Sequence, residues 1–93
     1  MVEGEKYLEK KLNNSVKKLG GLSIKLLSTH LTGLPDRLCL LPSGRLFFAE
    51  LKTTNKKATK IQLLVHRKLI SLGFSVHVID NSIQLSKILE EYE

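Results

Sequence analysis

The 93-residue sequence has no tryptophan, a single cysteine and few aromatic side chains. One cysteine, Cys39, excludes an internal disulfide and is typical of proteins of a reducing cytoplasm. With no second cysteine and three scattered histidines, the sequence offers no structural zinc site. Aromatic residues make up 5% of the chain, which disfavours the aromatic hot spot of a large protein-binding or antitoxin-like surface.

Long apolar runs are also missing. No charge-free stretch approaches the roughly 18 residues that a membrane-spanning helix needs. The first residues, MVEGEKYLEKK, are charged from the start, so we expect neither a secretory signal nor a membrane partner. Hydrophobic residues make up 42% of the chain, which suits one small globular domain over residues 1–93.

Basic residues are plentiful and concentrated in the middle of the chain. The formal net charge is +6, and residues 37–68 contain one acid, Glu50, and eight basic residues: Arg37, Arg45, Lys52, Lys56, Lys57, Lys60, Arg67 and Lys68. The other acids lie mainly near the two ends. A basic middle segment favours a polyanionic partner, most simply a nucleic acid. Charge alone is equally compatible with a solvated basic surface.

Hydrophobic periodicity predicts the order of elements. Leu8, Leu12 and Val16 form one stripe of a helix over 5–19, which Gly20-Gly21 ends. The remaining pattern predicts an edge strand at 22–27, a loop at 28–35, strands at 36–41 and 45–52, a helix at 60–72, a strand at 74–79 and a terminal helix from 82. The fold class is α/β, a small mixed β-sheet flanked by helices in the order α-β-β-β-α-β-α.

The helix predicted at 60–72 carries many apolar residues. Five of them are expected to form its inner face against the sheet: Ile61, Leu64, Val65, Leu69 and Leu72.

The turn between the two central strands predicts their register. Pro42 suits the second position of a type I turn, and Gly44 stands where a left-handed residue is needed. Together they indicate a three-residue hairpin loop, 42–44, with a glycine bulge. Asp36 then stands opposite Glu50, whereas a two-residue loop would put them on opposite faces.

Glu50 and Lys52 are two residues apart and share a strand face, which Asp36 joins in the predicted register. Carboxylates facing each other in this way repel, and a divalent cation such as Mg²⁺ removes the conflict. Lys52 beside them is suited to orient a water molecule or to neutralise charge on a phosphate. The alternative is a set of ordinary ion pairs on a solvated sheet face.

The first helix offers a further carboxylate. Glu5 falls within the apolar stripe of that helix and Glu9 falls at its edge, so Glu5 is the better placed to reach the sheet. An acid that only complements the helix dipole is the alternative.

The role of Gln62 has two interpretations. TKIQ fits a capping box with Thr59 as N-cap, and the same glutamine lies close to the proposed site. His66, one turn later on the same face, is expected to be a surface or phosphate-contacting residue.

With these residues assembled, the chain resembles the VRR-NUC (virus-type replication–repair nuclease) family of the PD-(D/E)xK superfamily. The resemblance covers nearly the whole chain, through EKYLEKKLNNSVKKLGGLSIKL, TGLPDRLCLLPSGRLFFAELK and KIQLLVHRKLISLGFSVHVID. Its signature is Pro35-Asp36, then Glu50-Leu51-Lys52, then Gln62. The loop TTNKKATK departs from the family by lacking the Arg or Pro often found after the E-x-K motif.

The resemblance implies a restriction-endonuclease-like core and Mg²⁺- or Mn²⁺-dependent cleavage of DNA. It implies Asp36, Glu50 and the Leu51 carbonyl as metal ligands, Lys52 as the catalytic lysine, and Gln62 as a supporting residue. Glu5 would be the acid of the first helix and a further ligand. Residues expected to contact DNA are Arg37, Lys56, Lys57, Lys60 and Arg67. Family members of this size resemble phage proteins that act as homodimers on branched DNA. The alternative is a non-catalytic nucleic-acid-binding module on the same fold.

Overall fold

The computed structural model describes residues 2–27 and 29–93. Ser28, the first residue of the loop predicted at 28–35, lies outside this description. The elements follow the predicted order: α1 (Glu5–Lys18), β1 (Leu22–Lys25), β2 (Arg37–Leu40), a 3-10 turn (Pro42–Gly44), β3 (Leu46–Leu51), α2 (Lys60–Ser71), β4 (Val76–Ile79) and α3 (Ser82–Glu90). No helix within the described residues is both long and apolar enough to cross a membrane.

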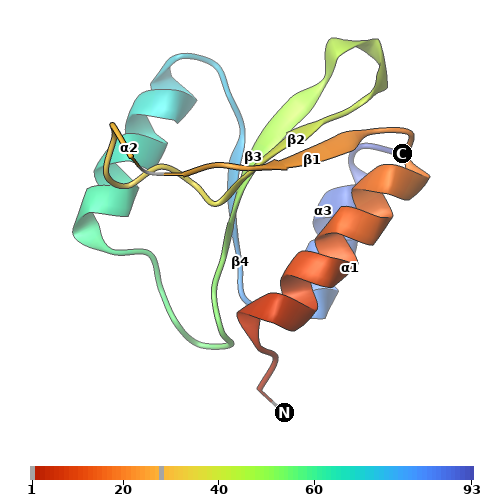
Figure 1. Cartoon of the computed structure of the whole chain (residues 1–93), viewed down its shortest axis with the longest axis horizontal. Helices are drawn as coiled ribbons and strands as arrows, with labels where there is room; N and C mark the ends of the chain where they lie inside the picture. The colour runs from red at the N-terminus through yellow and green to blue at the C-terminus, as the bar shows by residue number, and fades with distance from the viewer. Residues whose placement is uncertain (1, 28) are drawn as a thin grey trace.

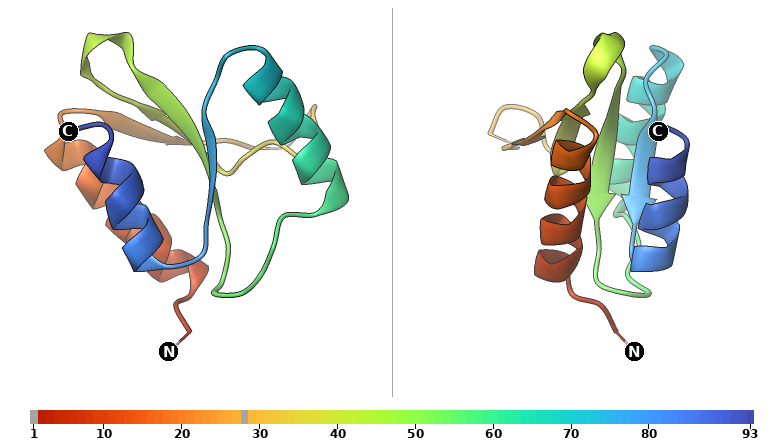
Figure 2. Two further views of the ribbon diagram at one scale, coloured as in Figure 1. Left: turned by 180° about the vertical axis from the view of Figure 1, so that it is seen from behind. Right: turned by 90° about the vertical axis from the view of Figure 1, so that its right-hand side faces the viewer.

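The strands form one mixed sheet in the order β1-β2-β3-β4. β1 pairs with β2, and β2 with β3, in antiparallel fashion, whereas β3 and β4 run parallel. β3 and β4 can run parallel because the connection through α2 returns the chain to the end of the sheet at which β3 begins. Helices α1 and α3 lie side by side, and α2 lies on the other side of the strands (Figures 1 and 2).

The hydrophobic core lies between the sheet and the α1–α3 pair. The predicted stripe of α1 is confirmed, because Leu8, Leu12 and Val16 have no exposed surface. Alternate residues of β2 and β3 face this stripe, with Cys39 and Phe47 completely buried. Burial raises the pKa of the Cys39 thiol to about 11, so it stays protonated at neutral pH.

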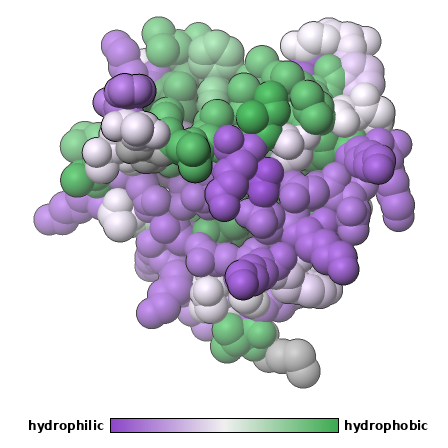
Figure 3. All heavy atoms as spheres, in the orientation of Figure 1, coloured by the Kyte–Doolittle hydropathy of each residue, from purple (hydrophilic) through white to green (hydrophobic). Residues whose placement is uncertain are grey.

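The opposite sheet face is covered much less. The register places Leu22 beside Leu40, and Phe48 beside Val76, on this face. Phe74, just before β4, packs edge-on against Phe48 with ring centroids 5.9 Å apart. We call this surface the open apolar face; its residues are Leu22, Ile24, Leu38, Leu40, Leu46, Phe48, Phe74 and Val76. Figure 3 shows apolar surface in the upper part of the view and hydrophilic surface below it.

Helix α2 buries the face that periodicity predicts only in part: of the five residues, Val65 and Leu69 are half-buried, and for the other three the prediction was wrong. Ile61, Leu64 and Leu72 are 52%, 63% and 60% exposed, while the buried residue of the helix is His66. The helix meets the sheet mainly at the edge strand β4, so it turns only a narrow strip inward, made of Gln62, Val65, His66 and Leu69. The spacing of apolar residues therefore predicted where the helix lies in the sequence, but not which of its faces packs against the sheet.

The register predicted for the central hairpin is confirmed. Arg37 pairs with Ala49, Leu40 pairs with Leu46, and the loop has three residues, 42–44. The turn type differs from the prediction, because Ser43 as well as Gly44 has positive φ, at 67° and 75°. A type I turn keeps the residue after proline right-handed, so the loop reaches the same register through another backbone path.

Candidate active site

Asp36 stands at the start of β2, and its side chain reaches across to the end of β3. Its Oδ2 accepts a hydrogen bond of 2.8 Å from the backbone N–H of Leu51. Extending the observed pairing by one residue places Asp36 opposite Glu50. Asp36 is also close enough to raise the pKa of Glu50 through its charge. The structure therefore brings together the two carboxylates that the turn chemistry predicted to meet.

Glu50 is the most buried charged residue of the site, with 1% of its surface exposed. Its Oε2 lies 3.3 Å from Lys52 Nζ and accepts a hydrogen bond of 3.0 Å from Gln62 Nε2. Its Oε1 is buried and has no hydrogen-bond partner among the described residues. Burial, and then the charge of Asp36, raise the pKa of Glu50 to about 7, although Lys52 opposes the shift.

Gln62 serves two purposes at once, as the sequence suggested. Its backbone N–H donates to Thr59 Oγ1, and its Oε1 accepts from the Thr59 backbone N–H, which completes the capping box of α2. Its Nε2 remains free to donate to Glu50. The helix start is thus fixed to the carboxylate at the end of β3.

His66 was expected at the surface, but it is 4% exposed and faces the site. Its Nε2 lies 4.0 Å from Glu50 Oε1. Burial, and then the charge of Lys52, lower the pKa of His66, so the ring is neutral at neutral pH and the contact is no ion pair. The signal available in the sequence was the one-turn spacing from Gln62, which places both side chains on the same helix face.

The acids of α1 lie beside Asp36. A cavity of about 260 Å³ is lined by Glu5, Lys6, Glu9, Lys25, Asp36 and Leu51. Glu9 is engaged by Arg37, whose Nη2 lies 2.9 Å from its carboxylate, whereas Glu5 is exposed at the cavity. Arg37 is therefore buried in an ion pair on the α1 side, and the structure does not offer it to DNA as we had expected.

The side chains that could bind a metal are few. In the part of the chain that the structure describes, no three His, Cys, Asp or Glu side chains converge on one point. Two neighbouring carboxylates and an adjacent cavity nevertheless match Mg²⁺, which uses one or two carboxylates and fills its other positions with water and phosphate oxygens. Glu50 Oε1, which has no hydrogen-bond partner among the described residues, is an oxygen ligand of the hard type that Mg²⁺ prefers.

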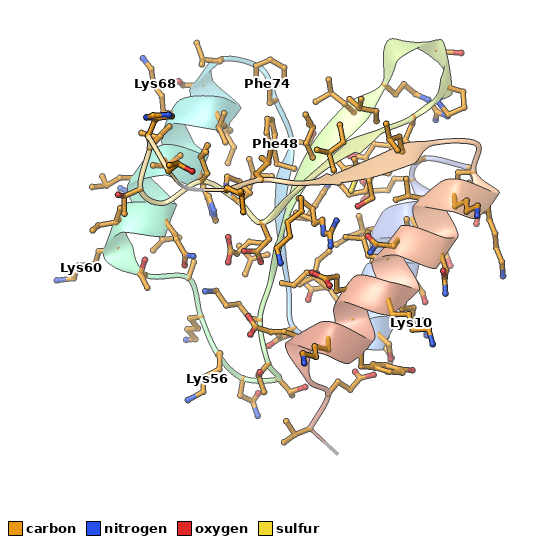
Figure 4. The ribbon with its side chains drawn as sticks, in the orientation of Figure 1. Lys10, Phe48, Lys56, Lys60, Lys68 and Phe74 are labelled. Carbon is orange, nitrogen blue, oxygen red and sulfur yellow. The ribbon has the colours of Figure 1, made fainter. Side chains whose placement is uncertain are left out.

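The loop between Lys52 and α2 is tied to the end of β4. Thr54 Oγ1 donates to the Asp80 carbonyl over 2.9 Å, and the Asn55 N–H donates to Asp80 Oδ2 over 3.1 Å. The cationic residues expected to contact DNA on this loop and on α2 are all exposed: Lys56, Lys57, Lys60 and Arg67. Figure 4 shows Lys56 and Lys60 projecting outward from this side of the molecule.

Comparison with known proteins identifies the chain. No family model matches the sequence. A protein of Acyrthosiphon pisum secondary endosymbiont phage 1, named "Putative nuclease p44", is 42% identical over 85 residues, which cover 91% of this chain and 90% of that protein. A solved structure described as "VRR_NUC domain" superposes with a TM-score of 0.90 at 33% identity, covering 96% of this chain and 97% of the other. The chain belongs to the VRR-NUC family.

Membership in the VRR-NUC family confirms the fold class that the sequence predicted. The four-stranded mixed sheet and its flanking helices are those of a VRR-NUC nuclease domain. The chain matches both relatives over nearly their full length.

Proposed function

We propose that the chain is a Mg²⁺- or Mn²⁺-dependent DNA endonuclease that hydrolyses phosphodiester bonds, selects branched DNA such as four-way junctions and acts as a homodimer in the cytoplasm of a bacterial or phage-infected cell. The observation that carries the proposal is the meeting of Asp36, Glu50 and Lys52 at one end of the sheet. Buried like charges of this kind are costly in a structural role and are typical of functional sites.

Asp36 and Glu50 would hold the divalent ion, together with the Leu51 carbonyl and with Glu5 at the rim of the cavity. Such an ion polarises a phosphate oxygen and neutralises the charge that develops on it. The partnerless Glu50 Oε1 and the cavity beside Asp36 support this assignment.

Lys52 acts on the reacting groups from the other side of Glu50. Its Nζ, held 3.3 Å from Glu50 Oε2, is suited to orient the attacking water or to donate to a phosphate oxygen. Gln62 keeps Glu50 in place from the start of α2. These two contacts leave Glu50 Oε1 as the oxygen available for binding.

Exposed cations are suited to hold the DNA backbone next to this site. Lys56 and Lys57 lie on the loop that is tied to the end of β4, and Lys60 and Arg67 stand on α2. Contacts from such residues to phosphates position a duplex without reading its sequence. They fit a nuclease that selects the shape of its substrate.

The open apolar face is the surface we assign to the homodimer. It combines exposed apolar residues such as Leu22 and Phe74, 60% and 40% exposed, with the half-buried Phe48. Glu50 stands on the same side of the sheet, so a two-fold pairing through this face would bring both sites to one assembly. Two related sites are what symmetric cutting of a junction requires.

The test is a cleavage panel of single-stranded, duplex, flap and four-way DNA with Mg²⁺, Mn²⁺ or EDTA. We expect metal-dependent cutting that is strongest on the four-way form. Asp36→Ala and Lys52→Ala should abolish cleavage while they keep most of the DNA binding. Binding without cleavage by the wild-type protein would instead support a non-catalytic module, and unchanged cleavage by both variants would refute the proposed mechanism.

A further inference from the structure

Two buried polar atoms in the site face each other without a partner. His66 Nε2 and Glu50 Oε1 are 4.0 Å apart, and neither makes a hydrogen bond to any residue that the structure describes. Both residues are almost completely buried, at 4% and 1% exposure. A buried polar atom left unpaired is destabilising, so pairing would satisfy both atoms together.

The position of His66 on α2 makes this pairing specific. Gln62 and His66 are one helical turn apart and face the same carboxylate. Gln62 Nε2 already holds Glu50 Oε2 at 3.0 Å. Oε1 has two lone pairs, so one can accept from the histidine while the other stays available to the ion. A side-chain rotation that shortens the gap by about 1 Å would bring His66 Nε2 within ordinary hydrogen-bond distance.

We propose that His66 is a positioning residue for Glu50: its Nε2–H donates to Oε1 while Gln62 donates to Oε2, so that α2 fixes the carboxylate from both oxygens. The neutral imidazole has one N–H donor, and an Nε2–H tautomer directs it at Glu50. A carboxylate held in this way before the ion arrives needs less reorganisation to bind it, as is general for residues that orient metal ligands. The inference rests on the proposed function, in which Glu50 is a metal ligand.

The packing of α2 supports this role. Its large apolar residues are mostly exposed, and its buried residue is His66. The helix therefore turns toward the sheet the side chains that contact Glu50. The apolar side chains of α2 nearest to this strip, Val65 and Leu69, are only half-buried, so His66 is not enclosed in an apolar core such as Leu8 and Leu12 form on α1.

Two substitutions of His66 distinguish a residue that positions Glu50 from one that only fills space in the protein interior. His66→Leu keeps the bulk and removes the donor, whereas His66→Gln keeps an N–H donor at a similar reach. Calorimetric titration with Mn²⁺ alone should show about tenfold weaker binding for His66→Leu and nearly wild-type binding for His66→Gln. Leu64→Ala, at a position 63% exposed on the same helix, is the matched control and should bind as the wild type does.

Further readouts keep the outcomes distinct. In the metal-free wild-type protein, imidazole ¹⁵N shifts should show His66 as the Nε2–H tautomer; an Nδ1–H tautomer would overturn the inference even if His66→Leu failed to fold. Wild-type Mn²⁺ affinity in a folded His66→Leu, or equal losses in the Leu and Gln variants, would also overturn it. A wild-type protein that neither binds Mn²⁺ nor cuts DNA would refute the proposed function instead.

Discussion

The side-chain amide of Gln62 joins the cap of α2 to the carboxylate of Glu50. Its oxygen accepts from the Thr59 N–H at 2.9 Å, and its nitrogen donates to Glu50 Oε2 at 3.0 Å. One residue thus couples helix formation to the orientation of a buried acid. The two contributions are separable because the hydrogen bonds of the Thr59 cap are made to Gln62 and not to Glu50.

Substitutions at the cap should distinguish stability from activity. Thr59→Ala and Gln62→Ala each remove part of the capping box, and each should lower the free energy of unfolding by about 1 kcal/mol in urea titrations. Gln62→Ala also frees Glu50 Oε2, so its cleavage rate should fall about tenfold, while Thr59→Ala should cut at nearly the wild-type rate. Equal cleavage rates for the two variants would show that the Gln62–Glu50 contact is only structural.

The pKa of Glu50 makes the metal-free protein less stable as pH rises. Its pKa is raised from 4.5 to about 7 by burial and by Asp36, so between those values the folded state holds the proton more tightly than the unfolded state. This contribution to the free energy of unfolding is therefore present at low pH and is lost as pH rises toward 8.

Glu50→Gln removes this dependence and retains the shape of the side chain. In EDTA at pH 8 the variant should be more stable than the wild type, on the order of 1–3 kcal/mol, and the difference should shrink toward pH 5. Urea unfolding at both pH values measures it. A Glu50→Gln protein that is less stable than the wild type by the same amount at pH 5 and pH 8 would contradict the assigned environment of Glu50.

How much of the site the sequence predicts depends on which interactions are local. The register that brings Asp36 to Glu50 follows from a three-residue loop, so it was predictable although Ser43 adopts an unexpected left-handed conformation. The cap formed by Thr59 and Gln62 was equally local.

The errors arose where contacts between distant segments decide the outcome. The inner face of α2 was misjudged in part because the helix meets the sheet mainly at the edge strand β4, which leaves Leu64 exposed and buries His66. Arg37 was expected to contact DNA, but the side of the strand on which it stands faces Glu9 of α1. Neither arrangement follows from periodicity within one segment.

Gly33 lets the loop before Asp36 lie against the first turn of α2. It has φ of +95°, and a Cβ there would lie 2.8 Å from the Ile61 carbonyl oxygen and 3.0 Å from Val65 Cγ2. Gly73 has a similar φ of +99°, but a Cβ there would meet no described atom within 4 Å. A Cβ at either position therefore carries the energetic cost of a left-handed backbone, but only at Gly33 would it also clash with neighbouring atoms.

Alanine at these glycines should separate the two effects. Gly73→Ala should cost roughly 1–2 kcal/mol for its left-handed backbone, with cleavage by the folded protein unchanged. Gly33→Ala should cost a further 1–3 kcal/mol through overpacking, and it should reduce cleavage because it pushes α2 away from Asp36. Denaturant titration and cleavage assays test both; equal effects of the two substitutions would argue against a close packing of this loop on α2.

The cations of the loop after Lys52 should control DNA affinity. Lys56→Ala and Lys57→Ala should each weaken binding of every DNA form, and each should lower the slope of log K against log salt by about 0.9. Lys87, an exposed lysine of α3 on the other side of the sheet, is the control and should leave the slope unchanged when replaced by alanine. Fluorescence anisotropy over a salt series measures the slope, and an equal effect of Lys87→Ala would indicate a diffuse charge effect.

The open apolar face should govern self-association. Phe74, 40% exposed and packed on Phe48, lies on that face, so a charge at this position would be buried at cost in a two-fold pairing. Phe74→Lys should therefore shift the protein from dimer to monomer in sedimentation velocity and lower junction cleavage. Ile83, 71% exposed on α3, is the matched control, and Ile83→Lys should remain dimeric. A wild-type protein that sediments as a monomer at assay concentration, or a Phe74→Lys dimer, would exclude this face as the pairing surface.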